Sequence, residues 1–173
     1  MNTLSIFTDA AISPQQTIAV GAYLYLDQNH LQKLTDCSIE QLTRELADRM
    51  TYQKYNSKKS TWTEIQNVID ALTFLQNQSE KNNNVTIYTD CQSLCDLLGK
   101  RKAKLQKSNF ITRSGKILQN ADLYQKLYAI ADCFQISIIK IKGHASQRIT
   151  IEEKIFSVVD KLCRKKLRFF LSR

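Results

Sequence analysis

The sequence predicts an α/β fold in which helices pack on a mixed β-sheet. Three observations support this fold class. Short apolar runs alternate with stretches of helical spacing along all 173 residues. Two or three of these runs follow one another at the start, which indicates an antiparallel meander. The later runs are each reached through a helix, so their strands should lie parallel to the first.

The first half of the chain is predicted to be rich in strands, with β-branched or aromatic residues between turn residues. The expected strands cover residues 4–9, 18–26, 30–38 and 50–57, with turns around Pro14 and at 27–29. Apolar residues at 39, 42, 46 and 50 are close to helical spacing. We therefore expect one helix, over 39–50, between the last two of these strands.

The second half of the chain alternates helices and strands. Its clearest helix covers 61–78, where the apolar residues form one stripe from Ile65 to Leu75. The other expected helices cover 92–98, 120–134 and 151–170, and the expected strands cover 85–90 and 136–142. No useful internal repeat is present, so we expect one domain.

Composition narrows the classes of function. A net charge of +9 is typical of proteins that bind nucleic acid or acidic membranes. No apolar run approaches ~18 residues and the start lacks a signal-peptide pattern, so neither a membrane span nor secretion is expected. With only 4 Gly and 1 Pro, the chain has no Gly-rich phosphate loop. Five cysteines without a CxxC pair predict reduced thiols and a cytoplasmic protein.

Two nearly identical tetrapeptides each end a predicted strand with an aspartate: Ile6 to Asp9 and Ile87 to Asp90. If these strands are parallel neighbours, their ends lie ~4.8 Å apart. Two ionised carboxylates at that distance repel, and a hard divalent cation such as Mg²⁺ relieves the repulsion. The alternative is that each aspartate caps the next helix, which suits Asp90 better than Asp9.

Three further candidates each have a structural alternative. Glu64 starts the best helix and is a possible third carboxylate. Thr61 to Glu64 also matches a capping box, and this fragment alone favours the capping role over the catalytic one. Asp160 lies among apolar residues of the last helix, where it either faces solvent or serves a site. His144 follows a predicted strand on a loop, where it is either incidental or catalytic.

Together these positions resemble type 1 ribonuclease H, the Asp-Glu-Asp-Asp nuclease that cuts the RNA of RNA–DNA hybrids. The resemblance covers almost the whole chain. Its most specific stretch is 120–146, where Asp-Leu-aromatic-Gln, a strand and Lys-Gly-His-Ala follow in family order. The run FSVVDKLCRKK around Asp160 is similar to the family's last helix. The resemblance implies a three-layer fold with a mixed five-stranded sheet, as one domain over 1–173.

The same resemblance implies an activity. Asp9, Glu64, Asp90 and Asp160 would bind two Mg²⁺ ions, with Mn²⁺ as a substitute, and His144 would assist proton transfer or product release. The RNA strand would be hydrolysed internally to 5′-phosphate and 3′-hydroxyl ends. The expected partner is RNA–DNA hybrid, and we expect a monomer with no small-molecule cofactor.

Basic residues predict where the hybrid binds. The segment 99–116 has seven basic residues and no acid, and it lies where several family members carry a basic protrusion. The alternative is that this segment is a solvated charged loop without a binding role. Phe110 in this segment is expected on a sugar or base surface. Before Glu64, residues 59–63 stand where many bacterial members of the family have a phosphate pocket, and Lys59, Ser60 and Thr61 could still contact a phosphate. The C-terminal tail, with Arg168 and Arg173, either extends this surface or aids solubility. The phosphate-binding candidates are Lys59, Ser60, Thr61, Lys100, Arg101, Lys102, Lys104 and Lys107.

Several departures from the family pattern bear on substrate choice. The Gly-rich stretch after Asp9 is absent, Phe156 stands where the family has an asparagine, and residues 30–50 look like an insertion. Two alternatives therefore remain: a non-catalytic nucleic-acid-binding module on this fold, or a nuclease of the same superfamily that acts on DNA. A 3′–5′ exonuclease is disfavoured because it needs Asp-x-Glu in the first strand, and Ala10 and Ala11 follow Asp9 here.

Overall fold

A computed structural model describes residues 3–78, 84–142 and 149–173 of the protein. The strands are β1 (Leu4–Ser13), β2 (Ile18–Asp27), β3 (Thr51–Tyr55), β4 (Asn84–Thr89) and β5 (Gln135–Lys140). The helices are α1 (Gln28–Lys33), α2 (Ile39–Ala47), α3 (Ser60–Asn77), α4 (Gln92–Leu98), α5 (Lys102–Lys107), α6 (Ala121–Ala131) and α7 (Ile151–Leu171). Within these residues no helix is long and apolar enough to cross a membrane.

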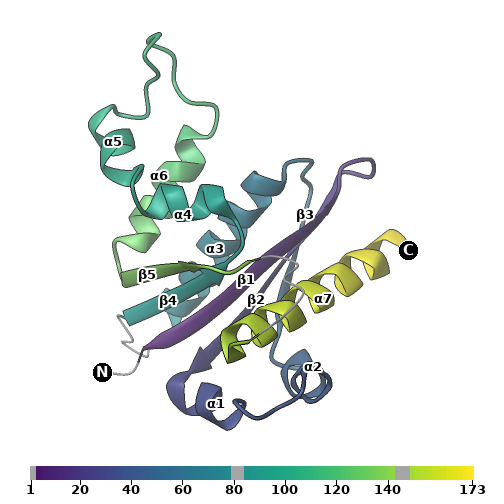
Figure 1. Ribbon diagram of the computed structural model, residues 1–173. Coiled ribbons are helices and arrows are strands. Elements are labelled where there is room, and N and C mark those ends of the chain that lie inside the picture. The colour runs from purple at the N-terminus through teal and green to yellow at the C-terminus, as the bar shows by residue number, and fades with distance from the viewer. Residues whose placement is uncertain (1–2, 79–83, 143–148) are drawn as a thin grey trace.

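The five strands form one sheet in the order β3-β2-β1-β4-β5 (Figure 1). Strands β1, β2 and β3 form the antiparallel meander, and β4 and β5 lie parallel to β1. The predicted mixed five-stranded sheet is therefore confirmed. The register pairs Ile6 with Ile87 and Phe7 with Tyr88, so the two similar tetrapeptides lie side by side.

Helices cover both faces of the sheet (Figure 1). On one face, α3 and α6 pack over a core that includes Ile65, Leu72 and Leu127. On the other face, α7 and α2 pack over Phe7 and Leu24. Each fully buried side chain of this kind contributes roughly 1.5–3 kcal/mol to the free energy of unfolding. Because β1 lies between the two cores, even its polar residues near the middle are buried.

The prediction of a strand over 30–38 is wrong, as is the turn at 27–29. Asp27 instead caps α1, because its carboxylate accepts a hydrogen bond of 2.7 Å from the His30 backbone amide. The following helix α2 begins with a capping box formed by Ser38 and Gln41. The segment that resembled an insertion thus forms two short helices, and α2 packs beside α7.

Strand β1 extends beyond its predicted end at Asp9. Its second half continues to Ser13 because it pairs with β2 up to the turn that contains Pro14. Pairing with β4, in contrast, covers only Leu4 to Phe7. The prediction that Asp9 ends a strand is therefore wrong. Asp9 lies where β1 has passed the end of its parallel neighbour β4.

A buried asparagine joins α3 to the central strands. The Asn67 side-chain amide donates hydrogen bonds to the backbone oxygens of Ala22 (2.9 Å) and Asp9 (3.3 Å). Gly21 makes this approach possible, since a Cβ there would lie 2.3 Å from Asn67 Oδ1 and 2.8 Å from a ring carbon of Tyr55. The contact fixes the position of α3 against β1 and β2.

We therefore expect Gly21→Ala to lower the free energy of unfolding by about 1–3 kcal/mol, the usual cost of overpacking a core. Chemical denaturation measures the loss. In an Asn67→Ala background the same substitution should cost less, because only the clash with Tyr55 remains. Equal costs in the two backgrounds would show that Asn67 is not what excludes a side chain at Gly21.

Candidate active site

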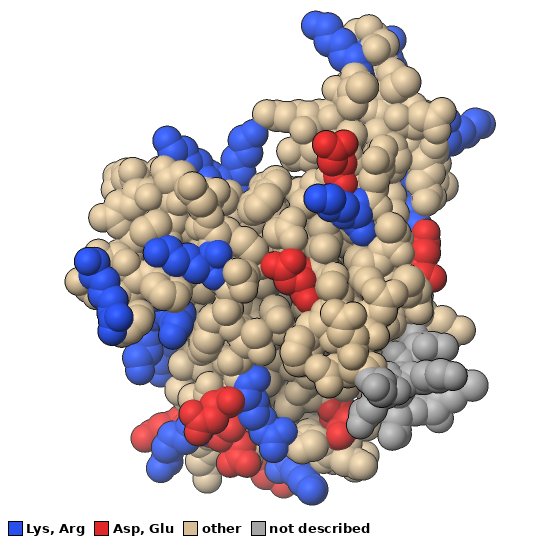
Figure 2. All heavy atoms as spheres, turned by 180° about the vertical axis from the view of Figure 1, so that it is seen from behind, with Lys and Arg blue, Asp and Glu red and all other residues tan. Residues whose placement is uncertain are grey.

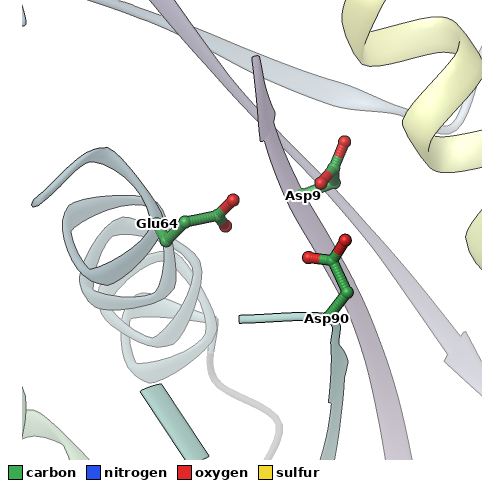
Figure 3. Close-up of side chains that lie close together, drawn as sticks. All are labelled: Asp9, Glu64 and Asp90. Atoms are coloured by element: carbon green, nitrogen blue, oxygen red, sulfur yellow. The ribbon is translucent and has the colours of Figure 1, made fainter. Parts of the chain in front are cut away.

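Three carboxylates meet beside β1, as Figure 3 shows. They belong to Asp9 on β1, Glu64 on α3 and Asp90 directly after β4, and one oxygen from each lies within 4.8 Å of the others. Asp9 and Glu64 are each only 5% exposed. The sequence-based expectation that Asp9 and Asp90 come together is confirmed, and Glu64 joins them from the other side.

The parting of β1 from β4 creates the space for this group. The parallel register ends at Phe7 and Tyr88, two residues before each aspartate. Beyond that point β4 ends, while β1 continues with β2 alone. The first turn of α3 packs under this gap, so Glu64 reaches toward Asp9 and Asp90 from the helical layer (Figure 3).

The capping-box interpretation of Glu64 is wrong. Helix α3 begins earlier than that interpretation requires, with Lys59 as its N-cap and no side-chain capping bond. Thr61 therefore lies inside the first turn. The Glu64 side chain turns into the protein, where its Oε2 atom is buried and has no hydrogen-bond partner among the described residues. A buried carboxylate oxygen without a donor is costly, and a bound cation would satisfy it.

Burial and mutual repulsion make this group electrostatically unusual. Burial, followed by the charges of Asp160 and Asp90, raises the pKa of Asp9 to about 8. Burial, followed by the charges of Asp9 and Asp90, also raises the pKa of Glu64. The Ala10 backbone amide lowers both pKa values but does not offset these causes. An oxygen-rich site with this self-repulsion suits a hard divalent cation.

Asp160 lies near this group but outside it. It projects from α7, on the opposite face of the sheet from α3, and its charge raises the pKa of Asp9. Its Oδ1 atom accepts a hydrogen bond of 2.6 Å from Arg164 Nε, one turn along the helix. The structure thus brings Asp160 within electrostatic range of Asp9 and pairs it with a cation of its own helix.

Two residues beneath Asp9 were missed by the sequence analysis. Asn67 bonds the Asp9 backbone oxygen from the α3 side. From the α7 side, the buried Cys163 thiol lies 3.4 Å from the Val20 backbone oxygen and 3.8 Å from that of Asp9. A polar residue one turn after Glu64, within an otherwise apolar helix face, was the available signal for Asn67.

The predicted phosphate-binding residues outside the carboxylate group lie at two places in the described chain. Lys59, Ser60 and Thr61 are exposed at the start of α3. His144 lies outside the described residues. Residues 100–118, which include helix α5, project from the body as a protrusion (Figure 1).

Within this protrusion, two of the predicted phosphate contacts already have acidic partners. Lys100 pairs with Asp96 at 3.2 Å. Lys102 pairs with Asp132 and lies over the Tyr128 ring. The expectation that Phe110 faces a ligand is wrong, because its side chain is buried against Tyr128 with ring centroids 6.0 Å apart. Phe110 therefore anchors the protrusion to the body.

The family model for RNase H matches residues 1–167. The chain belongs to the RNase H family. A ribonuclease H of Rippkaea orientalis is 35% identical over 65 residues, which cover 37% of this chain and 40% of that relative. The chain therefore matches less than half of this relative's length.

Solved structures share the fold at low sequence identity. The type 1 enzyme LC9-RNase H1, described as having the type 2 active-site motif, superposes with a TM-score of 0.67 at 12% identity, over 96% of this chain and 72% of that chain. The RNase H domain of PFV superposes with a TM-score of 0.62 at 16% identity, over 97% of this chain and 94% of that chain. These likenesses confirm the RNase H fold of the family member described here.

The pKa of Asp9 gives a testable pH dependence. The folded, metal-free protein keeps this proton up to about pH 8, whereas the unfolded chain loses it near the ordinary value of 3.8. Because the folded state binds more protons over this range, the free energy of unfolding should fall as pH rises from about 4 toward 8. Thermal unfolding in EDTA should show a Tm lower by several degrees at the higher pH, since 1 kcal/mol corresponds to about 2–4 °C in a chain of this size.

The matched variant is Asp9→Asn, which removes the charge and keeps the shape. Its Tm in EDTA should change less between pH 5 and pH 8 than that of the wild type, and it should be the more stable protein at pH 8. Added Mg²⁺ should stabilise only the wild type, because the cation binds the folded carboxylates. A wild-type stability that rises over this pH range would contradict the electrostatic account of the site.

Proposed function

We propose that this member of the RNase H family is an endonuclease that hydrolyses the RNA strand of RNA–DNA hybrids. The observation that carries the proposal is the group of Asp9, Glu64 and Asp90, in which Asp9 and Glu64 are buried and one Glu64 oxygen has no partner among the described residues. The fold adds support: a foamy viral protease-reverse transcriptase solved with RNA/DNA hybrid superposes with a TM-score of 0.57 at 11% identity, over 95% of this chain and 19% of that chain.

The donor set fits divalent cations. Asp9, Glu64 and Asp90, with Asp160 from the facing helix, would hold two Mg²⁺ ions, and Mn²⁺ would substitute because it accepts the same oxygen ligands. When bound, the cations would supply Lewis acidity toward the scissile phosphate and a water of lowered pKa. The expected products carry 5′-phosphate and 3′-hydroxyl ends.

The protein's own groups have distinct roles in this proposal. Asp9 keeps its proton near neutral pH in the metal-free protein, so cation binding would release it. Arg164 holds Asp160 in the metal-free protein and would release that carboxylate when the cations bind. Asn67 holds the backbone at Asp9 against α3 and so keeps two ligands at a fixed separation. His144 remains the proposed assistant in proton transfer or product release.

The protrusion offers a surface for the hybrid. A hollow of about 680 Å³ lies on it, lined by Arg101, Lys104 and Arg113 over an apolar floor of Leu105 and Leu118. Lys104 and Arg113 form no ion pair within the part of the chain that the structure describes. Figure 2 shows basic side chains on the protrusion, which stands out from the body. Such cations would contact phosphates without reading base sequence.

The first test of the function is a substrate panel. With Mg²⁺, the wild type should cut the RNA strand of labelled RNA–DNA hybrid and leave duplex DNA, duplex RNA and single strands intact. Glu64→Gln is the matched variant, because it keeps side-chain size and leaves no cap to lose. Its turnover should fall roughly 100-fold or more, since loss of a group that only supports a ligand already costs about 10–100-fold. Its Tm should stay the same or rise, because buried repulsion is relieved.

Each alternative function has its own result in this panel. Cleavage of duplex DNA would indicate a DNA-directed nuclease of the same superfamily. Hybrid binding without cleavage by the wild type, at any Mg²⁺ or Mn²⁺ concentration, would indicate a non-catalytic binding module. Either outcome would overturn the proposal.

The second test addresses the protrusion. Changing Arg101, Lys104 and Arg113 to Gln should raise KM for hybrid and leave kcat unchanged, because these side chains would contact phosphates away from the carboxylates. The slope of log affinity against log salt should fall by about 0.9 for each phosphate interaction removed on a B-form duplex, and by a similar amount on a hybrid. The control changes Lys33, Arg44 and Lys126 to Gln, which removes the same charge from exposed positions on α1, α2 and α6. If KM rises equally in both, the effect is net charge and the protrusion is only a solvated segment.

A further inference from the structure

The last part of α7 forms a surface that the proposed active site does not use. Residues 161–173 contain five basic residues besides Lys161 and no acidic one. They contact the edge strand β3, since Lys166 lies over the Tyr52 ring and Lys54 lies over the Phe170 ring. We define the α7 surface by its charged and aromatic members: Tyr52, Lys54, Lys165, Lys166, Arg168, Phe169, Phe170 and Arg173.

Three of the five cations of the α7 surface lie on aromatic rings: Lys54, Lys166 and Arg173. Lys166 Nζ lies 5.4 Å from the centroid of Tyr52 and 5.1 Å from that of Phe169. Lys54 Nζ, from β3, lies 5.1 Å from the Phe170 centroid, and the Arg173 guanidinium lies 4.4 Å from that of Phe169. A ring orients a cation but does not neutralise it as a carboxylate does. The positive charge of the surface is therefore held in place and stays available to an anionic ligand.

Helix α7 connects this surface directly to the carboxylate site. Asp160, Arg164 and Arg168 follow one another at spacings of four residues, so they lie along one side of the helix. At 1.5 Å per residue, Asp160 and Arg168 are separated by about 12 Å. With phosphates spaced about 3.4 Å apart along a duplex strand, this distance corresponds to about three or four nucleotides. A strand that leaves the active site along α7 would therefore meet the basic residues.

We propose that the α7 surface binds single-stranded nucleic acid that extends from the hybrid in the active site. Lys165 and Arg168, both exposed, would contact phosphates. Phe169 is 44% exposed, and an unpaired base would stack on its ring in place of the Arg173 guanidinium at the end of the chain, as bases stack on aromatic residues in other single-strand sites. Beside Lys54 a hollow of about 410 Å³, lined by Gln16, Thr17 and Asn56, continues the surface toward the β1–β2 turn.

An unpaired strand suits this surface better than an acidic membrane does. Insertion into a membrane interface requires an apolar face of several large side chains. Among the described residues of the α7 surface, Phe169 is the one large apolar side chain that is exposed. The proposal depends on the proposed function only in taking nucleic acid as the ligand, so binding can be tested without hydrolysis.

The experiment measures the fluorescence anisotropy of a labelled DNA single strand of about 12 nucleotides, within the usual size of such sites. EDTA is present, so neither metal binding nor cleavage contributes. One variant, Lys165→Gln with Arg168→Gln, removes two exposed charges and leaves Arg164 and Asp160 in place. A second, Phe169→Leu, keeps an apolar side chain but cannot stack. The control, Lys33→Gln with Lys126→Gln, removes the same charge from exposed positions on α1 and α6.

The double charge variant should raise Kd about 10-fold at low salt. Its slope of log affinity against log salt should fall by about 1.4, which is about 0.7 for each phosphate of the single strand that is no longer bound. Phe169→Leu should raise Kd at least about 5-fold, the lower end of measured base stacking. The control should stay within about 2-fold of the wild type, and all variants should keep the wild-type Tm.

A second measurement links the surface to hydrolysis. A single-stranded extension on the hybrid should lower KM for the wild type without changing kcat, and the advantage should disappear in both α7 variants. Equal Kd in the α7 variants and the control would overturn the proposal, whatever the activity. So would a wild type that binds anionic vesicles and not the single strand, because the surface would then be a membrane contact. Loss of hydrolysis with single-strand binding intact would overturn the proposed function alone.

Discussion

Repulsion among the carboxylates of Asp9, Glu64 and Asp90, of which the first two are buried, constrains the architecture around the site. Asp9 and Glu64 are almost completely removed from water, and one buried oxygen of Glu64 has no donor among the described groups. A protein without a ligand for these oxygens would gain stability by replacing them with apolar residues. The surrounding fold instead holds them together, which is the arrangement expected where a site is built to bind cations and not to maximise stability.

The fold holds the carboxylates in place through backbone contacts and not through the carboxylates themselves. Asn67 reaches from α3 to the backbone oxygens of Asp9 and Ala22, and Gly21 leaves the space that this contact requires. Two apolar cores, one on each face of the sheet, fix β1 between α3 and α7. Because the backbone positions are set by packing, the side-chain oxygens cannot separate to relieve their repulsion. The cost is carried by raised pKa values and would be offset by cation binding.

Positive charge is distributed around this acidic centre in two different ways. On the protrusion, part of the charge is used internally, since Lys100 and Lys102 pair with acidic residues. At the end of α7, Lys166 and Arg173 instead lie on aromatic rings and keep their charge for an external anion. A count of basic residues in the sequence treats these two regions alike. The structure distinguishes them because a salt bridge neutralises a cation and an aromatic ring does not.

The order of strands and helices over most of the chain could be predicted from hydrophobic periodicity, which depends only on which face of each element is buried. The sequence also placed Asp9 beside Asp90, because two similar strand sequences ending in the same residue predicted parallel neighbours. It predicted a strand over 30–38, where the local cap by Asp27 produces a helix. The role of Glu64 could be assigned only from the folded structure, since its fragment alone favours a capping box and the choice depends on where α3 begins against β1. The same holds for Asn67, Phe110 and Lys102: each has a role set by contacts with residues distant in sequence, and no local pattern encodes such contacts.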